Sequence, residues 1–180
     1  FWIKNKLILS KFKEIVKQFM PSYVKKLKLY KDKKPIFFNH GIEKKIVDIN
    51  NPNVRLKSGG YLVINQTEAL VAIDINSGKF TKNRNIEDTA FQTNLEAADE
   101  ISRQIRIRDL AGLIVIDFID MLERNHNYKV EKRLKDLLKS DRARIQVGRI
   151  SNFGLLELSR QRLKVNEGSK VSIKCSHCNG

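Results

Sequence analysis

Two aspartates in this chain directly follow apolar runs that are typical of buried strands. Asp74 comes after residues 70–73, and Asp117 comes after residues 113–116. An acid in such a place is costly to bury unless it is paired, hydrogen-bonded or bound to a metal. Asn76 lies on the same side as Asp74 if that strand continues. The residues between the two runs leave room for one helical crossover, which would bring the two strands side by side.

These side chains offer the oxygen ligands that a hard divalent cation prefers. Asp74, Asn76 and Asp117 would suit Mg²⁺ or Mn²⁺, which keeps several waters and shares its coordination with a substrate phosphate. The pattern therefore favours phosphodiester chemistry. A structural interpretation stays open, in which the two aspartates cap strand ends or pair with basic residues. Asp120 is expected to be structural, because it should face another side of a continuing strand.

Composition indicates one substantial core and a polyanionic partner. The chain has 180 residues, of which 41% are hydrophobic, and a net charge of +15. Residues 1–50 contribute much of this excess, with 13 lysines, no arginine and 4 acids. A basic surface favours nucleic acid, because neutralising phosphates releases their counterions. A lysine-rich composition that serves only solubility is the alternative.

Neither a membrane span nor a disulfide framework is expected. No run approaches the roughly 18 to 20 apolar residues of a spanning helix, and no signal-peptide pattern opens the chain, so a cytoplasmic protein is predicted. Cys175 and Cys178 form Cys-Ser-His-Cys, which is spaced like half of a tetrahedral zinc site. A pair of free reduced thiols is the alternative.

The periodicity of the chain predicts an α/β fold, a mixed β-sheet with packed helices. A core-facing helix is expected from Trp2 to Met20, and a subdomain boundary near residue 55. The remaining expected elements are a hairpin of residues 61–65 and 69–76, a helix from Asn85 that Gly112 ends, a strand over 113–119, a helix around 130–138 and strands over 144–150 and 155–158. His40 and His126 are expected to have surface or capping roles.

Several longer motifs then carry a resemblance to a known family. They are Ser-Gly-Gly-Tyr-Leu-Val-Ile, Thr-Glu-Ala-Leu-Val-Ala-Ile-Asp-Ile-Asn-Ser-Gly, Thr-Asn-Leu-Glu-Ala-Ala-Asp-Glu-Ile, Arg-Asp-Leu-Ala-Gly-Leu-Ile-Val-Ile-Asp-Phe-Ile-Asp-Met, Asp-Arg-Ala-Arg and Phe-Gly-Leu-Leu-Glu-Leu-Ser-Arg-Gln-Arg. Together they resemble the catalytic region of the ribonuclease E/G family. The resemblance implies a partial RNase H-like subdomain at residues 1–55, a DNase I-like catalytic subdomain at 56–165 and a zinc-link at 166–180.

The resemblance also implies an activity and its residues. Family members are Mg²⁺-dependent endoribonucleases that cut single-stranded A/U-rich RNA in messenger RNA decay and in ribosomal and transfer RNA processing. Asp74 and Asp117 would be the catalytic Mg²⁺ ligands, with Asn76 beside them. The ion would activate a water for in-line attack on phosphorus, and the products would carry a 5′-phosphate and a 3′-hydroxyl.

Other family features fall on basic and cysteine residues. Arg144 matches an arginine that helps to recognise a 5′-monophosphate, a task suited to a planar charged fork. Four other arginines could line an RNA path or make structural ion pairs: Arg142, Arg149, Arg160 and Arg162. Cys175 and Cys178 match a motif in which two protomers share one Zn²⁺, which implies a homo-oligomer. The sequence has Ser176 where proline is common in the family, and His177 offers a competing ligand.

The family's S1 RNA-binding domain and 5′-sensor are not found ahead of Phe1. They would have to act in trans, and some family members work at the inner membrane as peripheral proteins. Two functions are therefore expected to compete. One is a catalytic fragment of a ribonuclease E-like enzyme, and the other is a silent relic that binds RNA or dimerises.

Overall fold

The computed structural model describes residues 1–78 and 86–163. Two compact units divide the chain between Asn50 and Asn51. The first unit contains β1 (Trp2–Ile3), α1 (Lys6–Phe19), a 3₁₀ helix η1 (Pro21–Lys26), β2 (Lys28–Leu29), α2 (Ile36–Asn39) and α3 (Ile42–Asp48). The strands β1 and β2 pair in parallel.

Helix α1 begins and ends where local chemistry dictates. The Asn5 side chain accepts the backbone N–H groups of Leu7 and Ile8 at 2.8 and 3.1 Å, which satisfies two donors of the first turn. Pro21 opens η1 directly after the helix. In this unit Leu9 and Val16 of α1 pack with Leu27.

The expectation of a core-facing helix from Trp2 onward was wrong for much of its apolar surface. Trp2 belongs to β1, and five apolar side chains of α1 are exposed: Leu7, Ile8, Phe12, Ile15 and Phe19. Within the described residues α1 packs mainly on η1 and the two short strands. These elements cover one stripe of the helix, and its other apolar stripe stays in solvent.

The second unit is built on a six-stranded mixed sheet in the order β3-β4-β5-β6-β8-β7. Its strands are β3 (Asn53–Arg55), β4 (Tyr61–Gln66), β5 (Val71–Asn76), β6 (Gly112–Asp117), β7 (Ile145–Ile150) and β8 (Leu155–Arg160). Only β5 and β6 run in parallel, and α4 (Ile86–Ile107) connects them as a helical crossover. The predicted hairpin, the crossover and the mixed α/β sheet are thus confirmed.

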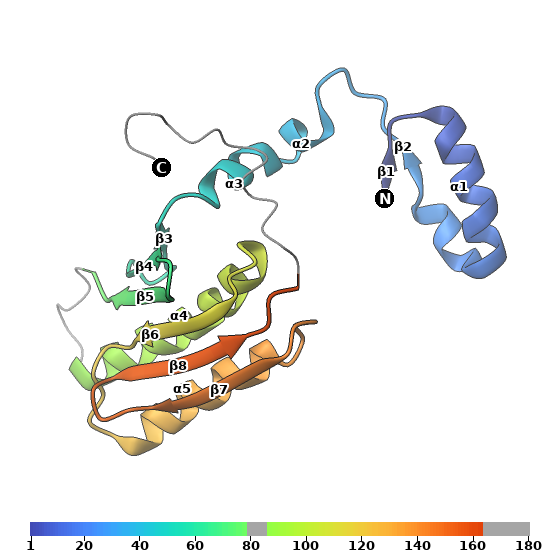
Figure 1. Ribbon diagram of the computed structural model, residues 1–180. Helices are drawn as coiled ribbons and strands as arrows, with labels where there is room; N and C mark the ends of the chain where they lie inside the picture. The colour runs from blue at the N-terminus through green and yellow to red at the C-terminus, as the bar shows by residue number, and fades with distance from the viewer. Residues whose placement is uncertain (79–85, 164–180) are drawn as a thin grey trace. The chain divides into compact units, whose positions relative to one another are not determined.

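Helices α4 and α5 (Arg124–Leu138) pack together and cover one face of this sheet (Figure 1). Alternate strand residues supply the core beneath them, including Leu62, Ile73, Ile114, Ile116, Leu156 and Leu158, all with at most 1% exposure. The strand residues between them point to the opposite face. That opposite face carries Asp74 and Asp117, both exposed.

Two predicted boundaries differ from the structure. Helix α4 ends at Ile107, not at Gly112, because Asp109 takes a left-handed conformation with φ 48° and the Leu110 N–H returns to the Ile105 carbonyl at 3.0 Å. Strand β6 ends at Asp117, two residues before the predicted end. The Asn85 cap lies outside the described residues. No helix in the described ranges is long and apolar enough to span a bilayer.

Candidate metal site on the open face of the sheet

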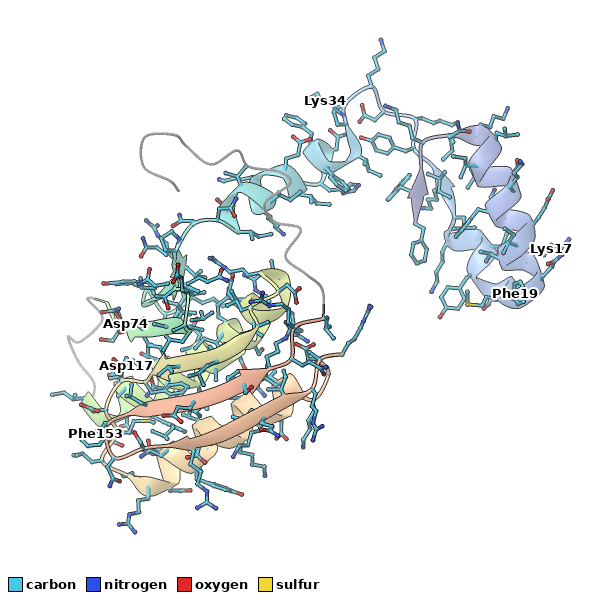
Figure 2. All side chains as sticks on the ribbon, viewed as in Figure 1. Lys17, Phe19, Lys34, Asp74, Asp117 and Phe153 are labelled. Carbon is cyan, nitrogen blue, oxygen red and sulfur yellow. The ribbon has the colours of Figure 1, made fainter. Side chains whose placement is uncertain are left out.

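Strand register brings the two predicted catalytic aspartates together. Asp74 is directly opposite Asp117 where β5 and β6 run in parallel. Neighbouring strands lie about 4.8 Å apart, so both carboxylates are within reach of one cation. Asp74 and Asp117 lie at the same end of the sheet, where Phe153 is also labelled (Figure 2). The structure therefore has the pairing that a shared cation requires.

Asn76 contacts the first of these acids. Its Nδ2 donates a hydrogen bond to Asp74 Oδ2 at 2.8 Å. Both side chains point to the same face because they are two residues apart on β5. The amide thus lies beside the acids, where the sequence placed it. A cation here would take the Asn76 oxygen only after the amide turned about its last torsion.

The acids repel one another, and this repulsion favours a cation. Burial, together with the charges of Asp74 and Asp120, raises the pKa of the Asp117 carboxyl above its usual range. A divalent ion between the carboxylates would remove this repulsion. No three His, Cys, Asp or Glu side chains in the described ranges are arranged as a metal cluster. The donor set that fits Mg²⁺ is therefore two carboxylates and an amide, with water or phosphate completing the shell.

Asp120 lies closer to this site than expected. The expectation that it faces another side assumed a continuing strand, but β6 stops at Asp117. The chain then turns, and a Cβ placed on Gly154 would lie 3.1 Å from Asp120 Oδ1 and 3.9 Å from Asp117 Oδ1. Both carboxylates therefore border the same glycine, and Asp120 belongs to the electrostatic surroundings of Asp117.

A buried amide fixes the backbone that follows Asp117. Asn94 of α4 is fully buried, with 0% exposure. Its Nδ2 donates to the Ile119 carbonyl at 2.8 Å, and its Oδ1 accepts the Ile119 N–H at 3.1 Å. The Phe118 N–H also donates to the Gly154 carbonyl at 3.1 Å. These bonds replace the strand ladder and end β6 at the acid. Asn94 is a polar residue on the buried face of α4, and its type at that position was the available signal for this role.

Close backbone packing also holds the Asn76 end of β5. A Cβ on Gly60 would lie 2.6 Å from the Asn76 carbonyl oxygen, so only glycine allows this approach. The loop before Gly60 is held to α4, because the Glu96 carboxylate accepts the Lys57 and Ser58 N–H groups. The loop therefore fixes the backbone of Asn76, the candidate ligand. This role was not predicted from the small residues in the loop's sequence.

His126 is buried, so of the two roles expected from the sequence, surface or capping, the surface role is wrong. It is 9% exposed, stacks on Phe91 at 4.1 Å between ring centroids, and bonds Glu87 through Nδ1 at 2.7 Å. Glu87 also accepts the N–H groups of Leu122 and Glu123. The Leu122 N–H and His126 lower the pKa of the Glu87 carboxyl. This group fixes the start of α5 to the first turn of α4. His40, by contrast, is exposed and caps α2, as predicted.

Arg144 lies far from the paired acids. Its neighbour Ile145 pairs with Arg160, which pairs with Gly112 at the opposite end of β6 from Asp117. Asp117 lies five residue positions along the strand from Gly112, which is roughly 16 Å at the usual rise per residue. The exposed Arg144 side chain cannot share the aspartates' cation, and a contact with RNA would have to occur at a second place.

Of the two roles expected for Arg160, an RNA contact or a structural ion pair, the structure shows the structural ion pair. Its guanidinium is buried and donates to Asp109 at 2.7 Å, to Asp141 at 3.0 Å and to the Leu110 carbonyl at 3.0 Å. Arg142, Arg149 and Arg162 are exposed. Cys175 and Cys178 lie outside the described residues.

These features define a mixed α/β protein with a paired-carboxylate site on an open sheet face. The ribonuclease E/G family model matches residues 1–163, and the chain belongs to this family. It is 51% identical over 178 residues to ribonuclease E of Haemophilus influenzae, covering 99% of this chain and 19% of that protein. It is 54% identical over 160 residues to ribonuclease E of Escherichia coli, covering 89% of this chain and 15% of that protein.

Ribonuclease G proteins are also similar. The Haemophilus influenzae ribonuclease G is 41% identical over 178 residues, covering 99% of this chain and 36% of that protein. The chain is thus a homologue of ribonuclease E/G-type endoribonucleases, and it spans between 15% and 36% of the length of these relatives.

Proposed function

We propose that this chain is the metal-binding part of a Mg²⁺-dependent endoribonuclease that cuts single-stranded A/U-rich RNA. The observation that carries the proposal is the register of Asp74 opposite Asp117 on parallel strands. The names of the relatives supply the substrate class. The family resemblance implies that the RNA belongs to messenger, ribosomal and transfer RNA pathways.

Each residue of the site has a separate task in this proposal. Asp74 and Asp117 hold Mg²⁺, and Asn76 completes the protein's share of the coordination. A Mg²⁺ ion held there would supply an activated water and neutralise charge on the scissile phosphate, and the products would carry a 5′-phosphate and a 3′-hydroxyl. The hydrogen bonds of Asn94 to Ile119 hold the segment that follows Asp117. The Asp117 carboxylate is therefore kept in position.

The proposal includes two further sites. Arg144 binds the 5′-monophosphate of the substrate at a distance from the acids. Cys175 and Cys178 share one Zn²⁺ with a second protomer, and portions with S1 and 5′-sensor functions join in trans or in the same longer protein. The subdomains keep the assignments made from the sequence, RNase H-like before residue 55 and DNase I-like after it.

The test is cleavage of a 5′-monophosphorylated A/U-rich oligonucleotide by the unaltered chain and by Asp74→Asn and Asp117→Asn. Both variants should lose at least about a hundredfold in Mg²⁺-dependent rate, because each removes a charged ligand. Glu157→Gln is the matched control, since this exposed acid lies on the same sheet face opposite Val115. It should retain the rate of the unaltered chain.

Thermal unfolding separates lost chemistry from lost structure. The unaltered chain and Glu157→Gln should gain stability when Mg²⁺ is added, and the two aspartate variants should not. Full cleavage by either aspartate variant would overturn the metal assignment. RNA binding by the unaltered chain without any Mg²⁺-dependent cleavage would support the alternative, a silent RNA-binding relic.

A further inference from the structure

Phe153 is an exposed aromatic ring on a rigid turn. Its side chain is 83% exposed at the connection between β7 and β8. The turn is closed by backbone hydrogen bonds from Ser151 to Leu155 at 2.8 Å and from Gly154 to Ser151 at 3.1 Å. The Ser151 hydroxyl also accepts the Phe153 N–H at 3.2 Å. The backbone that carries the ring is therefore fixed although the ring itself packs on little.

This turn borders the paired acids. Leu155, two residues after Phe153, is directly opposite Asp117 in the sheet. Gly154, the next residue, has φ 76° and no side chain between its backbone and the carboxylates of Asp117 and Asp120. Figure 2 shows Phe153 at the same end of the sheet as Asp74 and Asp117. A substrate held at the acids would pass within reach of the ring.

A groove begins beside the same turn. Its volume is about 700 Å³, and it runs from Asp120 and Gly154 along α5. Three cations line it, Arg124, Lys135 and Arg149, and none of them has an ion pair among the described residues.

Two acids also line the groove. One is Asp120, and the other is Glu131, whose carboxylate accepts the Ile150 N–H at 2.8 Å. The three cationic side chains outnumber these two acids in the lining of the groove. Tyr128, with 60% exposure, contributes an aromatic ring to the wall. Unpaired cations next to exposed rings are the combination by which proteins hold single-stranded nucleic acid.

We propose that Phe153 stacks on a nucleobase next to the scissile phosphate, and that the RNA strand then follows the groove along α5 with its phosphates near Arg124 and Arg149. This inference rests on the proposed function and adds a base-stacking subsite to it. The site suits a single strand, because only unpaired bases offer an open face to an aromatic ring. A stacking subsite of this kind accepts any base, since every base has a π-face.

The experiment compares Phe153→Ala, Phe153→Trp and Leu122→Ala in the full chain. Leu122 is the matched control, since it lines the groove near this turn and is 91% exposed but has no aromatic face. Binding of a fluorescent A/U-rich oligonucleotide is measured in EDTA, which prevents cleavage. Phe153→Ala should bind about tenfold more weakly, and Phe153→Trp and Leu122→Ala should bind as the unaltered chain does.

A set of oligonucleotides with a single abasic position locates the stacked base. At one position, removing the base should weaken binding by the unaltered chain and abolish the difference between it and Phe153→Ala. Equal binding by Phe153→Ala, equal losses in Leu122→Ala, or a Phe153 effect that no abasic position removes would overturn the subsite. A Phe153→Ala change that alters only self-association, seen by sedimentation, would assign the ring to a protein contact and also overturn it.

Cleavage in Mg²⁺ distinguishes the two proposals. If RNA binding depends on Phe153 but the unaltered chain does not cleave, the subsite stands and the endonuclease assignment fails. If the unaltered chain cleaves and Phe153→Ala cleaves with the same KM and the same site preference, the endonuclease assignment stands and the subsite fails.

Discussion

At the scale of single residues, the candidate site holds carboxylates close together, which is unfavourable when no cation is bound. Asp117 sits beside two other carboxylates and has a raised pKa, so its charged form is disfavoured without a counterion. A cation reverses this balance by binding the ionised form. As the pH falls toward this raised pKa, protons compete with the cation, and Mg²⁺ affinity should weaken in the same direction.

Arg144 gives a residue-scale prediction about substrate ends. Arg144→Ala should remove the preference for a 5′-monophosphorylated over a 5′-hydroxyl oligonucleotide, and it should change the rate on the 5′-hydroxyl substrate by less than about twofold. Its distance from Asp117 is the physical reason, because the side chain does not touch the metal site. The measurement is kcat/KM on the two substrates, with exposed Arg162→Ala as the control. A preserved preference would remove Arg144 from this role.

At the scale of elements, two polar contacts decide where strands end and turns begin. Asn94 ends β6 by binding the Ile119 backbone. At the opposite end of the sheet, Arg160 of β8 joins the turn after α4 through Asp109 and the turn after α5 through Asp141. A buried arginine of this kind is held by its partners, and removing one of them leaves an uncompensated charge.

The ion pair between Asp141 and Arg160 predicts a pH dependence of stability. Burial alone would raise the pKa of Asp141, but hydrogen bonds from Arg160 and the Ala143 N–H outweigh it and lower the pKa. This carboxylate therefore adds stability above its unfolded pKa of about 3.9, and the contribution is lost as the pH falls through the lower folded value.

Asp141→Asn should lower the free energy of unfolding by about 2 kcal/mol at pH 7, and the difference from the unaltered chain should shrink below about pH 4. Thermal unfolding across this pH range is the measurement. Asp136→Asn is the control, because its pair with Lys139 is solvent-exposed and should matter little. A difference in stability between Asp141→Asn and the unaltered chain that stays constant down to pH 2 would contradict this pH dependence.

At the scale of the whole molecule, the chain combines two compact units with a large positive charge. The net charge of +15 and the lysines of residues 1–50 favour a polyanion for the molecule as a whole. The chain covers a minor part of its relatives' length. The activity and assembly of these whole relatives are therefore proposals for this chain.

The zinc-link gives a prediction at this scale. Zinc content should be about one half per chain, because each of two protomers supplies two of four thiolates. Cys178→Ser should remove both the zinc and the dimer, whereas His177→Ala should keep them if the thiolates are the ligands. Metal analysis combined with sedimentation tests this. One zinc per chain in a monomer, or no zinc at all, would contradict a shared site.

The sequence was sufficient to predict the elements that carry the acids. Alternating and continuous apolar runs identified β4, β5, β6, β7 and β8, since burial of one or both faces imposes these patterns. The side of Asn76 followed from the two-residue period of a strand. The structural roles of Asn94, Asp120 and His126 did not follow, because each depends on a partner between 3 and 39 residues away.

From the sequence alone, local periodicity and residue chemistry predicted that Asp74 and Asp117 lie near the ends of two neighbouring strands and that oxygen ligands would gather there. Only the tertiary structure decided the register that sets these acids opposite each other, the approach of Asp120 through the turn at Gly154, and the separation of Arg144 from the acids. The physical reason is that patterns along the chain report burial, whereas the packing of α4 on the sheet and the hydrogen bonds between strands fix which distant residues meet.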